Sequence, residues 1–333
     1  MKYKNLFCGL AAVVFLSLQI FAQTSGYRIS APISYKNLSV FLIHGKDEIK
    51  NKNILTLQEA MEKDLFVVYE TSDVNELTVE NKSSQYEVFI QSGDIVKGGK
   101  QDRVLAITII IPANSGKVSI EAFCVESGRW QKRGNEKSGQ FSSSNDRIVS
   151  RDLKIAANQS RSQGEVWKEV AKAQDKLSSN VGGRVNSDDS ATSLQLALEN
   201  KKVIATTEEY VNQLANIIDG KDDVIGYAFV INGKINSADI YASNFLFKKL
   251  WLKLLKASAI EAVSELKDGK QNKLVKISEI QSFMDDADNG KTEERKVNPR
   301  NKSVTREGKQ EVVFEARDEK NKVTLHKSYV KIQ

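Results

Sequence analysis

The sequence predicts an α+β protein: an antiparallel sheet with a packed helical layer, followed by a small β-rich C-terminal extension. Short apolar runs separated by Gly, Asn, Asp and Ser breaks fill residues 38–131, as a meandering antiparallel sheet requires. Helix-start signals with apolar residues at helical spacing then dominate residues 162–266. We therefore expect a signal peptide over residues 1–22, one α+β domain over residues 23–266 and the extension over residues 267–333.

The first 22 residues have the features of a secretory signal peptide. Lys2 and Lys4 precede an apolar run over residues 6–18, and the small Ala22 closes the segment. This order is typical of exported proteins, and the run is too short for a comfortable membrane span. We expect an exported protein, periplasmic or secreted, with no transmembrane segment after signal cleavage.

One short helix interrupts the predicted sheet. Thr56 and Glu59 form a capping box, in which each side chain bonds the other residue's backbone amide. A polar loop over residues 132–145 separates the sheet from the later helices. Strands are expected at residues 38–43 and 65–69, around 77–79 and 86–90, and in a central hairpin formed by residues 104–111 and a run from Val118.

The later helices are predicted from their capping residues. Ser162 and Glu165 form a second capping box, and Trp167 lies on the apolar face of the helix that follows. Further helices are expected from near Thr206 to Gly220, and from a cap at Asn244 to about residue 266.

Asn232 and Gly233 form the strongest turn signal in the chain. A two-residue hairpin turn needs positive φ at both positions, which Asn and Gly adopt most easily. The flanking residues 224–231 and 234–241 are therefore predicted to pair. Beyond the last helix we expect strands at residues 274–277, 312–316 and 323–325, and a flexible linker or loop over residues 285–308.

Two polar clusters flank the central hairpin. With residues 112–117 as its turn, the register places Arg103 opposite Glu126 and Gln101 opposite Gly128. Side chains distant in the sequence thereby converge at one end of the hairpin, where a ligand site can form.

The converging side chains suit an anionic or nucleotide-like ligand. Gly98 and Gly99 expose backbone amides, and lysine and arginine side chains supply positive charge. The loop is not a phosphate-binding P-loop, because Gln101 replaces the Ser or Thr that would hold magnesium. We predict ligand contacts from Lys100, Gln101, Arg103, Arg129 and Trp130, with structural support from Gly98, Gly99, Asp102, Gln163 and Trp167.

The composition argues against several chemistries. The chain has two histidines, His44 and His326, and neither lies in a recognisable catalytic setting. Cys124, the single cysteine after residue 22, shares the core face with Leu105 by parity, so we expect a buried, inert thiol and no intrachain disulfide. No HExxH, GxSxG or paired CxxC pattern is present, and we predict no metal site and no cofactor.

The basic excess lies in residues 246–333, where 20 Lys and Arg accompany 14 Asp and Glu. The interleaved acids argue against nucleic acid as a partner, and nothing in the sequence names a protein partner. The predicted helix over residues 244–266 gathers lysines on one arc opposite leucines and a tryptophan. This pattern fits a membrane-surface helix or an ordinary docked helix. The lysines are Lys248, Lys249, Lys253 and Lys256.

Several of these motifs, in this order, resemble one protein family, the ADP-ribosylglycohydrolase- and rhodanese-phosphatase-associated protein domain family. The resemblance covers roughly residues 35–266 and implies a link to ADP-ribose or NAD metabolism by association, with no activity. The signal peptide and the segment after residue 267 depart from the family pattern. The motifs are residues 98–103 and 124–130, Gln163 with Trp167, residues 225–241 and the lysine-bearing helix.

Three functions are open at this level. The first is a binding module for an anionic or nucleotide-like ligand, in which Glu126 positions a basic residue. The second is a hydrolase of phospho- or ADP-ribosyl compounds with Glu126 as general acid or base. The third is a structural protein of the cell envelope. An open cleft around an unpaired Glu126 would favour the enzyme. A pocket rimmed by arginines, with Glu126 already paired, would favour the binding module. A hairpin end filled by side chains would favour the structural protein.

Cleavage of the signal peptide is directly testable. We expect the mature N-terminus near Gln23, because Ala22 is the small residue that closes the apolar segment. Mass spectrometry of protein from the envelope fraction measures this, and an intact N-terminal peptide on cytosolic protein would contradict it.

Overall fold

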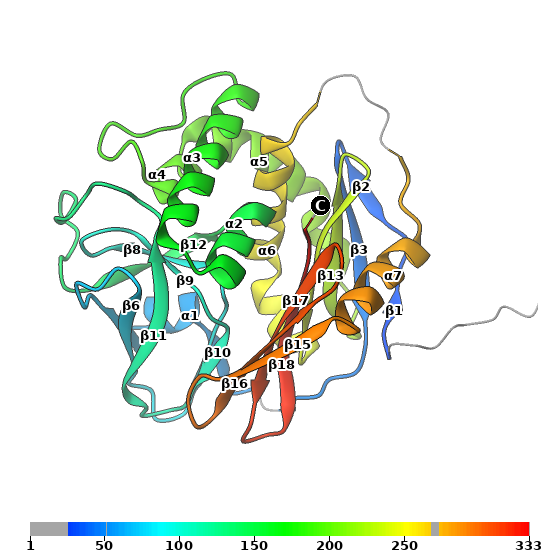
Figure 1. Cartoon of the computed structure of the whole chain (residues 1–333), viewed down its shortest axis with the longest axis horizontal. Helices are drawn as coiled ribbons and strands as arrows, with labels where there is room; N and C mark the ends of the chain where they lie inside the picture. Colours follow the sequence, from blue (N-terminus) through cyan, green and yellow to red (C-terminus); the bar gives the residue numbers. More distant parts are fainter. Residues whose placement is uncertain (1–25, 51, 268–272, 333) are drawn as a thin grey trace, which may run out of the picture.

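The structure is a computed structural model that describes residues 26–50, 52–267 and 273–332 (Figure 1). The expected signal peptide lies outside these residues. Antiparallel strands dominate and helices pack against them, so the α+β class is confirmed. Two β regions lie on either side of a central helix, α6 (Asn244–Ser264): the N-terminal sheets, formed by residues 54–147, and a larger central sheet.

The central sheet contains nine strands, which come from the N-terminal part of the described chain, from residues 224–241 and from the C-terminal part. They are β1 (Arg28–Ile29), β2 (Ile33–Tyr35), β3 (Leu38–His44), β13 (Val224–Ile231), β14 (Lys234–Tyr241), β15 (Lys291–Lys296), β16 (Asn301–Glu307), β17 (Glu311–Asp318) and β18 (Val323–Lys331). The order is β1-β3-β13-β14-β18-β17-β16-β15, with β2 also paired to β3. The turn from β13 to β14 has φ values of 51° at Asn232 and 70° at Gly233, which confirms the predicted hairpin.

The C-terminal strands are part of this sheet, because β18 pairs with β14. Two expectations for this region were wrong. Residues 285–308, expected as a linker or loop, form the end of α7 (Ile277–Asp288), β15 and β16, and the strand expected at residues 274–277 is a loop that leads into α7. Every residue of β15 except Arg295 is exposed, and the strand contains no apolar residue that could form an alternating pattern. Its strand conformation comes from its ladder with β16.

The N-terminal sheets have three and six strands. The smaller contains β4 (Ile54–Thr56), β7 (Glu87–Ile90) and β10 (Ile109–Ile111), with β4 and β7 parallel. The larger, in spatial order, contains β12 (Phe141–Arg147), β8 (Asp94–Gly98), β9 (Arg103–Leu105), β11 (Gly116–Cys124), β6 (Glu76–Asn81) and β5 (Phe66–Tyr69). Between them α1 (Leu57–Glu62) begins with the predicted capping box of Thr56 and Glu59.

The central hairpin was predicted with the wrong register. Arg103 pairs with Cys124 and Leu105 with Ala122, so Glu126 is not the cross-strand partner of Arg103. The two runs do not pair along their length, because β10 bonds to β7 and the first part of β11 bonds to β6. The observed ladder is displaced by two residues, which keeps each side chain on its predicted face. Cys124 and Leu105 are accordingly both buried.

The helical layer consists of α2 (Arg151–Ile155), a π-helical turn (Ala156–Ser160), α3 (Gln163–Asn180), α4 (Leu194–Leu198), α5 (Lys201–Leu214), a 3₁₀ turn (Ala215–Ile218) and α6. Ser162 caps α3 by accepting from the Glu165 amide, which is one half of the predicted capping box. Two other starts differ: Asn200 caps α5, which was expected near Thr206, and Ser243 caps α6 in place of Asn244. In each case the helix begins at the residue whose side-chain oxygen accepts a hydrogen bond from a free backbone amide of the first turn.

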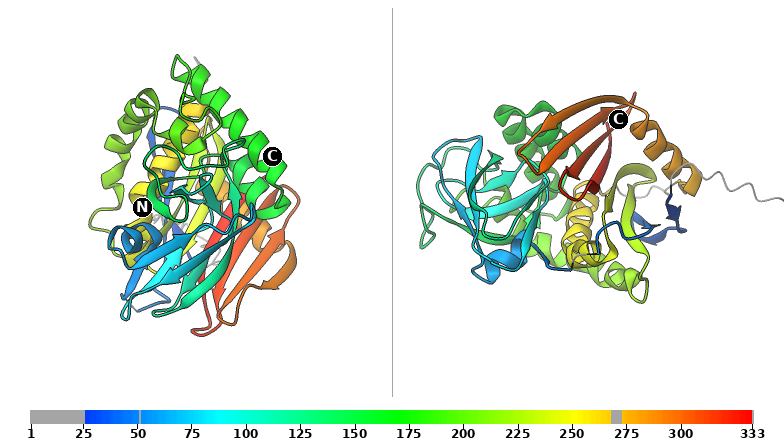
Figure 2. Two further views of the ribbon diagram at one scale, coloured as in Figure 1. Left: turned by 90° about the vertical axis from the view of Figure 1, so that its left-hand side faces the viewer. Right: turned by 90° about the horizontal axis from the view of Figure 1, so that it is seen from below.

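Helix α6 packs against β13 of the central sheet and against β4 and β12 of the N-terminal sheets (Figure 2). Its four lysines all form ion pairs within the protein, which confirms a docked helix over a membrane-surface helix. The pairs are Lys248–Asp222 (2.8 Å), Lys249–Glu59 (2.9 Å), Lys253–Asp94 (2.9 Å) and Lys256–Asp146 (2.6 Å). None of the helices in the described part of the chain combines the length and hydrophobicity that crossing a bilayer requires.

Candidate functional site

The predicted site lies at the turn between β8 and β9 and in the segment after β11. Gly98 and Gly99 have positive φ values of 111° and 56°. A Cβ atom at Gly99 would lie 2.5 Å from the Phe141 ring, so glycine is required here. The turn brings residues 100–103 against residues 124–129, as expected from the sequence, although through a different register.

Glu126 is fully buried and already paired. Arg129 binds it through Nε–Oε1 and Nη2–Oε2 contacts of 2.7 Å each, and the Asp102 amide donates to Oε2 at 3.0 Å. Burial alone would raise the pKa of this carboxyl, but hydrogen bonds from Arg129, Ser190 and a backbone amide outweigh it and lower the pKa. Glu126 is therefore a carboxylate at neutral pH whose two oxygens are both occupied.

Asp102 holds a second arginine that sequence reasoning missed. Arg133 binds both carboxylate oxygens of Asp102 at 3.0 Å, and the Ser193 hydroxyl donates to the same group at 2.8 Å. Burial acts to lower the pKa of Arg133, but its pairing with Asp102 and Glu136 raises it, so the guanidinium stays charged. Arg133 lies in the polar loop after β11, where no spacing pattern marks it as a partner of Asp102.

Arg103 is fully buried, and its carboxylate partner is Glu70 rather than Glu126. Its guanidinium donates to Glu70 at 3.2 Å and to the Val74 carbonyl at 3.1 Å, and it also contacts the sulfur of Cys124. Glu70 immediately follows β5, which is remote from β9 in the sequence. The pair therefore depends on the sheet order of the larger N-terminal sheet.

The two predicted glutamines make backbone contacts. Gln101 donates to the carbonyl of Glu126 at 2.8 Å, and Gln163 bonds both the amide and the carbonyl of Cys124 at 2.8 Å, as a neighbouring strand would. The other predicted side chains lie toward the surface: Lys100, which donates to Ser72 at 2.8 Å; Trp130, which is 52% exposed; and Trp167, which is half-buried on α3.

We call these paired side chains the arginine cluster: Arg103, Arg129 and Arg133 with Glu70, Asp102 and Glu126. Each arginine has a carboxylate partner within the protein, so an anionic ligand would have to displace an existing ion pair. This arrangement is the filled hairpin end that was expected to favour a structural role for these side chains. The ligand-binding role of the predicted residues stays a prediction.

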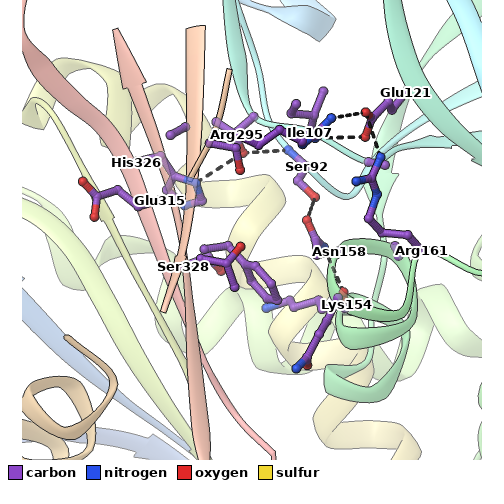
Figure 3. A pocket seen from close by; sticks show the side chains of 18 of the residues that line it. Ser92, Ile107, Glu121, Lys154, Asn158, Arg161, Arg295, Glu315, His326 and Ser328 are labelled. Atoms are coloured by element: carbon purple, nitrogen blue, oxygen red, sulfur yellow. Dashed lines mark hydrogen bonds and ion pairs between the residues drawn. The ribbon is translucent and has the colours of Figure 1, made fainter. Parts of the chain in front are cut away.

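A second polar site, which we call the cavity, lies between the N-terminal sheets and the central sheet (Figure 3). It measures about 170 Å³ and is lined from the loop between β9 and β10, from α2 and its π-helical turn, and from β15 to β18. On its exposed side Glu121 of β11 pairs with Arg295 of β15 and, at 2.9 Å, with Arg161. The Glu121–Arg295 pair joins the two β regions beside the cavity, and the Glu121–Arg161 pair joins β11 to the end of the π-helical turn.

His326 of β18 lies in the cavity wall within a chain of hydrogen bonds. Its Nε2 is 3.0 Å from Oδ1 of Asp239, and its Nδ1 is 3.4 Å from Oγ1 of Thr108, which accepts from the Ser92 amide at 3.0 Å. The amide nitrogen of Gln91 also lies near Nε2, at 3.4 Å, but the carboxylate of Asp239 is closer and only accepts. Asp239 therefore favours the tautomer with the proton on Nε2 and leaves Nδ1 as an acceptor. Burial lowers the pKa of His326 and Asp239 offsets only part of this, so the ring is neutral at neutral pH.

Two buried cations line the same cavity: Lys154 is 7% exposed and Arg147 is 4% exposed. The Lys154 ammonium lies 5.5 Å from the ring centre of Phe229 and has no ion pair among the described residues. Burial lowers the pKa of Lys154, and the attraction of Asp239 only partly offsets this. Arg147 donates to the Ser92 carbonyl at 2.7 Å, while its Nε has no partner within the described chain.

Sequence reasoning did not find the cavity. Thr108 and His326 are 218 positions apart and Asp239 and His326 are 87 apart, so no local spacing links them. The one available signal was a histidine within the strand-like C-terminal region, in a chain with two histidines. Among the residues that the structure describes, no group of three or more His, Cys, Asp or Glu is arranged to hold a metal ion.

Comparison with known proteins points to one family. The family model for the ARG and Rhodanese-Phosphatase-superfamily-associated Protein domain matches residues 26–330. This range extends beyond the residues 35–266 of the resemblance and includes the C-terminal strands, so the expectation that the segment after residue 267 departs from the family pattern was wrong. No curated protein and no solved structure matches the chain.

Replacing Arg129 with Ala tests the arginine cluster. We expect a loss of about 3 kcal/mol in the free energy of unfolding, because Glu126 would be left buried with fewer partners. Urea denaturation measures this, and Lys132→Ala at an exposed neighbouring position is the matched control. Equal stability of the two variants would contradict a structural role of Arg129 and would favour the hypothesis that the arginine cluster binds a ligand.

The thiol of Cys124 should resist modification. It is fully buried, and burial raises its pKa to about 11, an effect that Arg103 only partly opposes. We expect slow reaction with Ellman's reagent in native protein at pH 8 and complete reaction in urea. Rapid labelling of the native protein would show an accessible thiolate.

Proposed function

Because the chain belongs to the ARG and Rhodanese-Phosphatase-superfamily-associated Protein domain family, whose name gives no activity, we propose its function from the cavity. The protein is a binding module for a small anionic ligand, held by the ammonium of Lys154 and the guanidinium of Arg147. This proposal keeps the class of ligand expected from the sequence and moves its place from the arginine cluster to the cavity.

The observation that carries the proposal is a buried lysine with no carboxylate partner among the described residues. A buried ion loses its hydration, which costs several kcal/mol of free energy, and this cost stands unless a partner offsets it. Elsewhere in this protein the compensation is internal, as in Lys253–Asp94 and Arg103–Glu70. Lys154 instead lines a cavity, where a phosphate or carboxylate of a ligand would supply the missing negative charge.

The volume of the cavity limits what enters it. About 170 Å³ suits an anionic group rather than a whole nucleotide. The remainder of a larger ligand, such as a nucleotide or sugar phosphate, would extend toward the exposed side near Arg161 and Arg295. His326 and Thr108 offer further hydrogen bonds to the bound group. The family is named for its association with the ARG superfamily, and the link to ADP-ribose that the resemblance implies makes ADP-ribose and AMP the first nucleotides to test.

The other two functions receive less support. A hydrolase that uses Glu126 needs a carboxyl group open to substrate, whereas both oxygens of Glu126 are paired. A purely structural role agrees with the arginine cluster but leaves the unpaired Lys154 without a reason. The proposed place of binding is outside the cytosol, in the periplasm or the medium, and this rests on the pattern of residues 1–22 alone.

Replacing Lys154 with Met tests the proposal. We expect the ligand-free variant to melt at the same temperature as the natural protein or higher, because the change removes a buried amine whose charged form burial disfavours. The stabilisation by ligand should disappear. Thermal denaturation with phosphate, succinate, AMP and ADP-ribose measures both effects, and a ligand at 100 times its Kd would stabilise the natural protein by about 2.7 kcal/mol.

The matched control is Lys253→Met, which removes a lysine that is paired with the buried Asp94. This variant should lose stability and keep its response to the ligand. The proposal is refuted if none of the four anions raises the melting temperature of the natural protein, or if Lys154→Met responds as strongly as the natural protein does.

A further inference from the structure

We propose that the cavity also hydrolyses carboxylic esters of small anionic compounds, with Thr108 as nucleophile, His326 as its base and Asp239 as the residue that orients His326. The inference deepens the proposed function and rests on it, since the cations that hold the ligand would hold the substrate. Carboxylic esters are the substrate class because the three side chains form a hydroxyl–imidazole–carboxylate series, which is the arrangement used for acyl transfer.

The geometry supplies each contact that the series needs. Asp239 on β14 and His326 on β18 come from adjacent strands, and their contact of 3.0 Å fixes the imidazole proton on Nε2. The unprotonated Nδ1 then lies 3.4 Å from Oγ1 of Thr108, and this distance can shorten when substrate binds. Because the Ser92 amide donates to Oγ1, the hydroxyl hydrogen is free to point to Nδ1.

The surroundings hold the imidazole in place and keep it neutral. The ring of His326 stacks on Tyr241 with ring centres 4.6 Å apart, and it is 3% exposed. A neutral imidazole can accept a proton, as a base must. The neighbouring carboxyl of Asp239 stays ionised: burial would raise its pKa, but Lys154, His326 and Arg147 together lower it. It can therefore stabilise the imidazolium that forms.

The reaction proceeds in two balanced steps. Oγ1 of Thr108 attacks the ester carbonyl carbon and its proton passes to Nδ1 of His326; the bond to the alcohol oxygen breaks and the alcohol leaves with that proton. Water then attacks the acyl group on Thr108 and gives a proton to Nδ1. The acyl–oxygen bond breaks, the carboxylic acid leaves and Thr108 regains its proton. One ester and one water thus become one acid and one alcohol, with no oxidant or metal required.

The test uses two chromogenic esters, 4-nitrophenyl acetate and the anionic 4-nitrophenyl hydrogen succinate. We expect the anionic ester to be hydrolysed with the higher kcat/KM and to leave a succinyl group on Thr108, located by peptide mass spectrometry after rapid acid quenching. Thr108→Val and His326→Gln should each lower kcat/KM about 100-fold or more. Thr108→Ser should retain hydrolysis, because it keeps the hydroxyl.

The matched control is Thr292→Val, since Thr292 of β15 is exposed and is not among the residues that line the cavity. Its kcat/KM should be unchanged. Absence of acylation at Thr108, or full activity of Thr108→Val, would overturn the inference. If the natural protein is stabilised by anions yet neither ester acylates it, hydrolysis fails and binding stands; if anions have no effect either, both proposals fail.

Discussion

The structure depends on the burial of α6 between two β regions. Fifteen of its 21 residues are buried, so the helix needs cover on nearly every side. The central sheet covers one side and the N-terminal sheets cover another (Figure 2). Lys253 and Lys256 reach the buried carboxylates Asp94 and Asp146, which sets the rotation of the helix against the N-terminal sheets. The cavity lies where polar side chains from both β regions meet.

The protein treats buried charge in two different ways. In the arginine cluster every arginine has a carboxylate, so the desolvation of each ion is offset within the protein. In the cavity Lys154 and Arg147 are buried as deeply, and neither forms an ion pair with a carboxylate of the described residues; Asp239 attracts them without direct contact and is itself bonded to His326. An unbalanced group of buried cations costs stability, and a ligand that carries negative charge is the simplest reason to keep it.

The two sites also differ in what the sequence could reveal. Glycines, charges and a strand boundary gather within residues 98–103 and 124–130, so this convergence was predictable although its register was not. The pairs Arg103–Glu70 and Asp102–Arg133 depend on strand order and loop path, which no local pattern encodes. The cavity depends on β18 pairing with β14, a contact between segments that are far apart in the chain.

The sequence by itself determined the α+β class, the hairpin at Asn232 and Gly233, the cap of α3 at Ser162 and the burial of Cys124, because each follows from local backbone preference or from the two-residue period of a strand. Tertiary structure alone decided the register of β9 against β11, the strands β15 and β16, and the meeting of Thr108, Asp239 and His326. These features depend on which distant segments supply hydrogen bonds and counter-charges. Which segments meet is decided by the packing of the whole chain.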